Sequence, residues 1–142
     1  MQALAEFRFT LRRFLHFSEQ AAAAAGLTPQ QHQLLLQIAG APEGTVTAVG
    51  YLADRLALRH HSVVELGDRC EEAGLVVRER DPENRRQVIL NLTPEGRRLL
   101  RKLSKDHARE LHELGPQLIH ALKVVTTSES SSREQKESIQ KQ

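Results

Sequence analysis

The sequence predicts a mainly α-helical protein that carries a small β-sheet of two or three strands. The segment from Leu52 to Gly96 contains two short helical patterns separated by a tight turn, and then two alternating stretches joined by an arginine-bearing loop. Longer helical patterns precede and follow that segment. With 142 residues, of which 39% are hydrophobic, the chain is long enough for one domain with a core and too short for two ordinary domains.

Composition excludes several classes of protein. The single cysteine, Cys70, rules out an intrachain disulfide and a zinc site built from several cysteines. No apolar run approaches the length of a membrane span, and the N-terminus lacks the layout of a signal peptide. A cytoplasmic protein without a membrane partner is therefore expected. The formal net charge of +2 is weak support for a nucleic-acid partner, so the distribution of the arginines matters more than their sum.

The N-terminal third predicts two helices. Apolar side chains recur at helical spacing from Leu4 to Leu15, an alanine run follows, and Gly26 ends the pattern. Thr28 and Gln31 form a capping box at the start of a second helix, whose buried stripe includes Leu35. A glycine- and proline-containing loop over 40–44 ends that helix, and residues 45–47 can add a short extended segment.

The central part predicts the two short helices and the hairpin. The helices run from about Val49 to Ala57 and from about His60 to Ala73, and Gly74 ends the second in a left-handed conformation. The strands are Val76–Arg80 and Gln87–Leu92. Two glycines, Gly50 and Gly67, fall inside helices, where close packing is the expected reason.

The C-terminal part predicts a long helix that opens at Thr93-Pro94-Glu95 and is broken by Gly115-Pro116. A short helix over 118–125 follows. From Thr126 onward the chain is rich in Ser, Glu, Gln and Lys and is expected to be disordered, although a helical extension is the alternative. The basic residues between 97 and 105 are expected to form a solvated helix face.

Several motifs in this order resemble the MarR family of winged helix-turn-helix transcription regulators. The resemblance covers Ala5 to Val125 and rests on these stretches: Leu52–Leu56, Val63–Arg69, Glu72–Arg78, Asp81–Arg86 and Leu92–Arg97. It implies a dimer held together by its N- and C-terminal helices. The implied organisation is a dimerisation helix over 1–27, a DNA-binding lobe over 28–93, dimerisation helices over 94–125 and a polar tail over 126–142.

The predicted DNA contacts lie on the second short helix and on the loop of the hairpin. A helix that enters the major groove needs polar side chains on its outer face and apolar ones behind. A long cation at a loop tip can enter a minor groove or hold the flanking phosphates. The predicted contacts are His60, His61, Ser62, Glu65, Arg69, Arg85 and Arg86.

The resemblance also bears on how the loop, or wing, is oriented. Arg86 matches the arginine of the family's Asp-x-Arg wing motif, but Asn84 stands at the aspartate position. This departure puts in doubt an ion pair from that position. Asp68 is a hypothetical replacement partner for Arg86, and Asp68 and Arg78 are the predicted wing-orienting residues.

The remaining candidates are a thiol, the histidines and a ligand pocket. Cys70 falls on a buried stripe, which favours core packing over reactivity. The seven histidines include no pair at i, i+4 spacing, so no metal and no cofactor are predicted. By resemblance, an aromatic acid can bind beside the first helix, with its carboxylate at Arg12, Arg13 or His16 and its apolar part against Phe14, Phe17 and Leu35. The favoured alternative is that this face of the helix is buried in the dimer.

The sequence therefore favours a dimeric regulator, more often a repressor in this family, that binds double-stranded DNA at a pseudo-palindromic operator and responds to a small-molecule effector. The alternative is a winged-helix adaptor that binds proteins and has lost DNA binding. Catalysis is not predicted, because nucleophile–base pairs and phosphate-binding glycine loops do not occur at recognisable spacing in the sequence.

Overall fold

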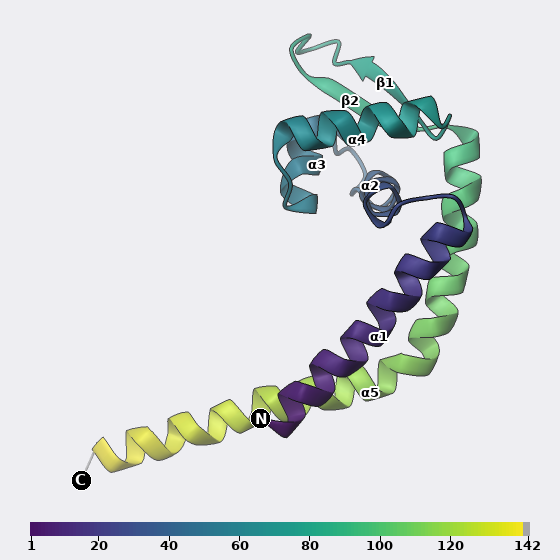
Figure 1. Ribbon diagram of the computed structural model, residues 1–142. Helices are drawn as coiled ribbons and strands as arrows, with labels where there is room; N and C mark the ends of the chain where they lie inside the picture. Colours follow the sequence, from purple (N-terminus) through teal and green to yellow (C-terminus); the bar gives the residue numbers. More distant parts are fainter. Residues whose placement is uncertain (141–142) are drawn as a thin grey trace. The chain divides into compact units, whose positions relative to one another are not determined.

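The computed structural model describes residues 1–140, and side chains up to residue 127. It confirms a mainly helical chain with a small antiparallel sheet, and Figure 1 follows the elements along the chain. Among the described residues, no helix is both long and apolar enough to cross a membrane. The elements are α1 (Gln2–Ala24), α2 (Pro29–Ala39), α3 (Val49–Leu56), α4 (His60–Glu72), β1 (Val76–Arg80), β2 (Val88–Leu92) and α5 (Pro94–Gln140).

The chain divides into two compact units. One unit is Glu19–Lys105, which contains α2, α3, α4 and both strands. The other unit combines Met1–Ser18 with the chain from Asp106 onward. We call them the central unit and the terminal unit. The boundary between them falls inside α1 and again inside α5.

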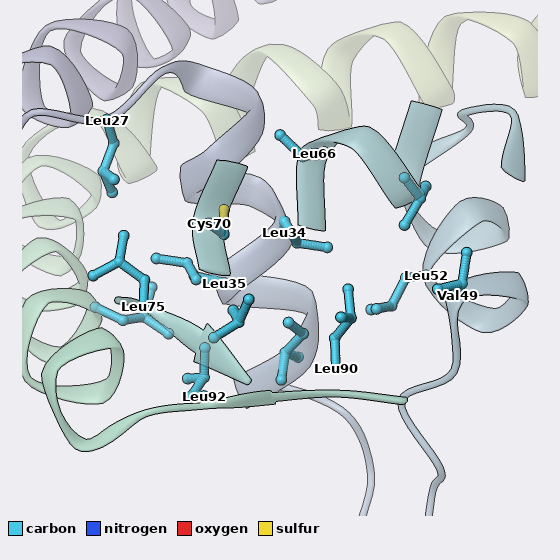
Figure 2. Packing of buried hydrophobic residues seen from close by; sticks show 14 of the residues in the cluster. Leu27, Leu34, Leu35, Val49, Leu52, Leu66, Cys70, Leu75, Leu90 and Leu92 are labelled. Carbon is cyan, nitrogen blue, oxygen red and sulfur yellow. The ribbon is translucent and has the colours of Figure 1, made fainter. Parts of the chain in front are cut away.

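The core of the central unit lies between α2, α3, α4 and the sheet. Figure 2 shows leucines of α2 pointing toward Leu66 and Cys70 of α4, with Leu90 and Leu92 of β2 along the other side. Burying a leucine- or valine-sized side chain stabilises a fold by about 1.5–3 kcal/mol, so this cluster fixes α4 against the sheet. The largest fully buried side chains are Leu34, Leu35, Leu52, Leu90, Val63, Val76 and Cys70.

Local signals set most of the helix boundaries as predicted. The Thr28 hydroxyl accepts a hydrogen bond from the Gln31 N–H (3.2 Å), and the Gln31 side chain accepts one from the Thr28 N–H (2.9 Å), which is the expected capping box. Gly26 and Gly74 adopt positive φ values of 79° and 73° at the ends of α1 and α4. Both glycine terminators are therefore confirmed.

The two predicted strands form an antiparallel hairpin, and β2 has a third, very short partner. Val76 lies opposite Leu92, and Arg80 lies opposite Val88. On the other side of β2, the Leu90 N–H donates to the Thr47 carbonyl (3.0 Å), and the Thr47 hydroxyl donates to the Leu90 carbonyl (2.7 Å). The extended segment expected before α3 is therefore present, as a single bridge between Ala48 and Ile89.

The predicted break at Gly115-Pro116 is wrong, because α5 continues through Pro116. A proline removes one helix hydrogen bond, but it does not end a helix whose buried stripe continues on both sides. Leu114 and Ala121 are 3% and 6% exposed, and they lie seven residues apart on one face. A separate helix over 118–125 is therefore absent from the described residues, and residues 126–140 extend α5 rather than forming a disordered tail. Residues 141–142 of that tail lie outside the described residues.

Candidate nucleic-acid interface

Helix α4 has one buried face and one exposed polar face. Val63, Leu66 and Cys70 are at most 3% exposed and belong to the core. The opposite face carries the predicted DNA contacts: His60, His61, Glu65 and Arg69 are exposed, and Ser62 is half-buried. A helix anchored along one face in this way can present the other to a groove without losing its own packing.

The turn that leads into α4 is tight although it lacks glycine. Ala57 adopts a left-handed conformation (φ 52°), and the Leu58 N–H donates to the Ala53 carbonyl (3.0 Å). This conformation costs a non-glycine residue about 1 kcal/mol, and the packing of α3 against α4 offsets it. The turn places Arg59 as the exposed residue just before α4. The predicted DNA contacts did not include Arg59, because a single cation in a turn does not by itself indicate a binding residue.

Helix α4 is fastened to the first strand of the wing by two carboxylates. Asp68 forms an ion pair with the Arg78 side chain. One turn along α4, the Glu71 carboxylate accepts a hydrogen bond from the Arg78 N–H (3.0 Å). The hypothesis that Asp68 holds Arg86 is wrong, because Arg78 on β1 takes that carboxylate instead. Asp68 and Arg78 remain 48% and 35% exposed, so their ion pair contributes little to the stability of the fold.

The tip of the wing is a hydrogen-bonded turn over residues 84–87. The Gln87 N–H donates to the Asn84 carbonyl (2.8 Å), and the Arg86 N–H donates to the Asn84 side-chain oxygen (3.3 Å). Asparagine favours the first position of such a turn, because its amide oxygen accepts a hydrogen bond as a carboxylate would. Arg85 and Arg86 therefore occupy the two central positions of the turn, and both are exposed.

Arg80 is a residue of the wing that the site prediction missed. It lies at the end of β1, and its Nη1 donates to the Arg85 carbonyl (3.1 Å). The alternation of β1 placed Arg80 in a strand, and only the folded hairpin brings its guanidinium to the turn. Four arginines on α4 and the wing are exposed: Arg69, Arg80, Arg85 and Arg86.

The thiol and the histidines contribute no second site. Cys70 is fully buried, which confirms its predicted packing role, and this burial raises its pKa from 9.0 to about 11. Within residues 1–140, no three His, Cys, Asp or Glu side chains converge as metal ligands would.

The residues predicted to line a ligand pocket fall in both units and differ in their exposure. Arg12, Arg13 and His16 are exposed on α1, where the Arg13 guanidinium lies 5.8 Å from the Phe9 ring centre. Phe17 packs edge-on against His107 at 5.4 Å between ring centres. Leu35 belongs instead to the core of the central unit, fully buried, so its predicted place in an accessible pocket is wrong.

The terminal unit contains a cavity of about 540 Å³ that the sequence did not predict. Its lining includes none of the residues named for the ligand pocket. Polar groups such as Glu6 and His120 share it with apolar ones such as Phe9 and Val124. Sequence periodicity could not find it, because α1 and α5 line it together from opposite ends of the chain.

Comparison with known proteins identifies the class of this fold. The family model that matches residues 25–87 is that of the MarR family. The chain is similar to AbsC of Streptomyces coelicolor, a MarR family transcriptional regulator, with 23% identity, a TM-score of 0.69, and coverage of 94% of this chain and 88% of that one. It is similar to a mutant of S. aureus MepR bound to an oligodeoxyribonucleotide, with 21% identity, a TM-score of 0.63, and coverage of 89% and 94%.

A known protein is also similar to this chain in sequence. It is a protein of Thauera aromatica named for transcriptional regulation of the hcr operon, and it is 29% identical over 121 residues, which are 82% of this chain and 71% of the relative. The family match covers α2 to the wing, where the exposed face of α4 and the arginine turn lie. Residues 25–87, which include α3, α4 and β1, match the MarR family, and the solved structures share the winged-helix fold of the chain.

Proposed function

We propose that this protein is a dimeric, sequence-specific DNA-binding regulator, acting as a repressor, whose operator affinity changes when a small aromatic or amphipathic ligand binds. The observation that carries DNA binding is the attachment of α4 to Arg78 of β1, the first strand of the hairpin whose turn bears Arg85 and Arg86. Asp68 and Glu71 both contact Arg78, so the helix and the wing are held as one surface. A surface of this kind can fill a major groove and reach the neighbouring backbone together.

The chemistry of the surface divides its residues into two roles. His60, His61, Ser62 and Glu65 carry donors and acceptors that can read base edges. The arginines carry charge without sequence preference, and they supply affinity by displacing counterions from phosphates. The affinity for duplex DNA should therefore fall steeply with salt, whereas the preference among sequences should depend on α4.

The exposed apolar side chains of the terminal unit support dimerisation. Phe9 and Ile119 are each 57% exposed, and Leu4 and Leu122 are 52% and 47% exposed. Side chains of this size clustered on the two helices of one small unit are typical of a contact surface. A second copy is the partner that such a surface fits in this family. A two-fold dimer would place two copies of α4 about one turn of DNA apart, so the operator should be a pseudo-palindrome.

The proposed binding site for the effector is the group of exposed cations on α1. Arg12, Arg13 and His16 lie on the exposed surface of α1, where they can meet an anionic group. A ligand can alter DNA affinity only if it binds better to one arrangement of the two DNA-binding lobes than to another. Calorimetric titration of a salicylate-like acid into the wild type and into Arg13→Ala tests this site, and equal heats would remove it.

The DNA proposal is tested by selecting bound sequences from random duplexes and then measuring affinity against salt. Arg85→Ala and Arg86→Ala should each weaken binding by about five- to tenfold, whereas Arg97→Ala, which removes an exposed cation from α5, should change it less than twofold. Enrichment of a pseudo-palindrome supports the function. No salt-sensitive binding to any duplex would instead favour the protein-binding adaptor.

A further inference from the structure

We propose that Arg80 is a positioning residue for the wing, which holds the turn at 84–87 in the conformation that presents Arg85 and Arg86. This inference rests on the proposed function, since its consequence is read in DNA affinity. It also has a structural consequence that can be measured without DNA.

The geometry of the turn supports this role. The Nη1 of Arg80, at the end of β1, donates a hydrogen bond to the carbonyl of Arg85 in the turn (3.1 Å). That carbonyl belongs to the peptide that links the two wing arginines, so fixing it fixes the direction in which both side chains leave the backbone. Below it, the Asp81 N–H donates to the Gln87 carbonyl (3.0 Å) and closes the hairpin.

The other hydrogen bonds of the loop join residues that are close in sequence. The Arg86 N–H reaches the Asn84 side chain at 3.3 Å, which is long for a hydrogen bond. Every residue from Pro82 to Arg86 is exposed, so burial of apolar surface adds little to the stability of the turn. A donor from strand β1 therefore ties the tip of the turn to the sheet, in addition to the hydrogen bond from the Gln87 N–H to the Asn84 carbonyl (2.8 Å) within the turn.

Arginine suits this task better than the other cations. Its planar guanidinium has five N–H donors, so it can donate to a carbonyl and keep further donors for a phosphate. A turn that is ordered before binding loses less conformational entropy when it meets DNA. The family's wing aspartate is replaced here by Asn84, and Arg80 supplies a hold that does not require a carboxylate.

A double-mutant cycle separates positioning from charge. Arg80→Met and Arg85→Ala are measured singly and together on the selected operator, at about 0.3 M salt, where separated exposed charges are largely screened. Arg85→Ala should weaken operator binding about fivefold in the wild type and less than twofold in Arg80→Met. The second effect is smaller because an Arg85 side chain that is no longer directed at the DNA contributes little to binding. Arg97→Met is the matched control for lost charge. Arg85→Ala should weaken operator binding by the same factor in Arg97→Met as in the wild type.

Amide hydrogen exchange measured by NMR on the free protein supplies the second readout. In Arg80→Met, the amides of Arg86 and Gln87 should exchange at least threefold faster, whereas those paired between Val77 and Asn91 should not change. The inference would be overturned if the two substitutions weakened DNA binding independently and the amide exchange rates of Arg86 and Gln87 did not change. Arg80 would then contribute to DNA binding only through its charge. If the wild type binds no duplex, the proposed function fails, and the exchange rates alone then support or refute the hold on the turn.

Discussion

Replacing Gly96 by alanine should destabilise the central unit, although alanine is the better helix former. A Cβ built on Gly96 would lie 2.1 Å from the carbonyl oxygen of Leu75 and 3.2 Å from its Cα. Relief of that overlap requires roughly 1 Å of movement by backbone, and overpacking of this kind costs about 1–3 kcal/mol. The Leu75 carbonyl also accepts the Thr93 N–H (3.0 Å), a hydrogen bond worth about 1 kcal/mol that the movement would weaken.

Alanine offsets about 1 kcal/mol of this through its helix propensity, so Gly96→Ala should lower the free energy of unfolding by about 2 kcal/mol. Gly50→Ala is the matched control, because nothing lies within 4 Å of its added Cβ; it should be neutral or stabilising by up to about 1 kcal/mol. Gly67→Ala should fall between them, since the nearest contacts of its Cβ are side-chain rather than backbone atoms, with Leu90 Cδ1 at 3.0 Å. Urea unfolding followed by circular dichroism measures all three, and equal midpoints for Gly96→Ala and Gly50→Ala would refute the reasoning.

Three further predictions concern other parts of the molecule. Because burial raises the pKa of Cys70 to about 11, the folded thiol stays neutral while the unfolded one ionises from about pH 9; unfolding free energy should therefore decline between pH 9 and 11 in the wild type, more than in Cys70→Ala. Asp68→Asn should weaken operator binding severalfold while lowering the free energy of unfolding by less than about 1 kcal/mol. A positioning role would be contradicted if the free energy of binding and the free energy of unfolding fell by the same amount. Ile119→Glu should shift sedimentation toward the monomer, and an unchanged dimer would exclude that face from the interface.

The two carboxylates of α4 show where prediction from sequence ended. Asp68 could be placed on the helix and suspected of orienting the wing, but the partner expected for it was Arg86, the wrong arginine of the hairpin. The structure brings Arg78 to it, and it also brings Glu71 to the Arg78 backbone. The choice depends on the distance between α4 and β1, which periodicity does not report.

The glycines make the same point in another way. Close packing was expected for both Gly50 and Gly67, and it occurs only at Gly67, where a Cβ would lie 3.0 Å from Leu90. The expectation for Gly50 is wrong, because a Cβ there would meet nothing within 4 Å. The most constrained helical glycine, Gly96, received no special expectation, since its neighbour Leu75 is 21 residues away along the chain.

By itself, the sequence determined the order of helices and strands, the helix ends at Gly26, Thr28 and Gly74, and the arginine-bearing loop. These features depend on backbone preference and on side-chain periodicity within a few residues, which the chain carries locally. Only the tertiary structure decided that α5 passes through Pro116, that Gly96 packs against the Leu75 backbone, and that Arg80 contacts the wing turn. Each of those outcomes depends on which surfaces meet in space, because packing can override a local breaker and can bring a distant donor to a carbonyl.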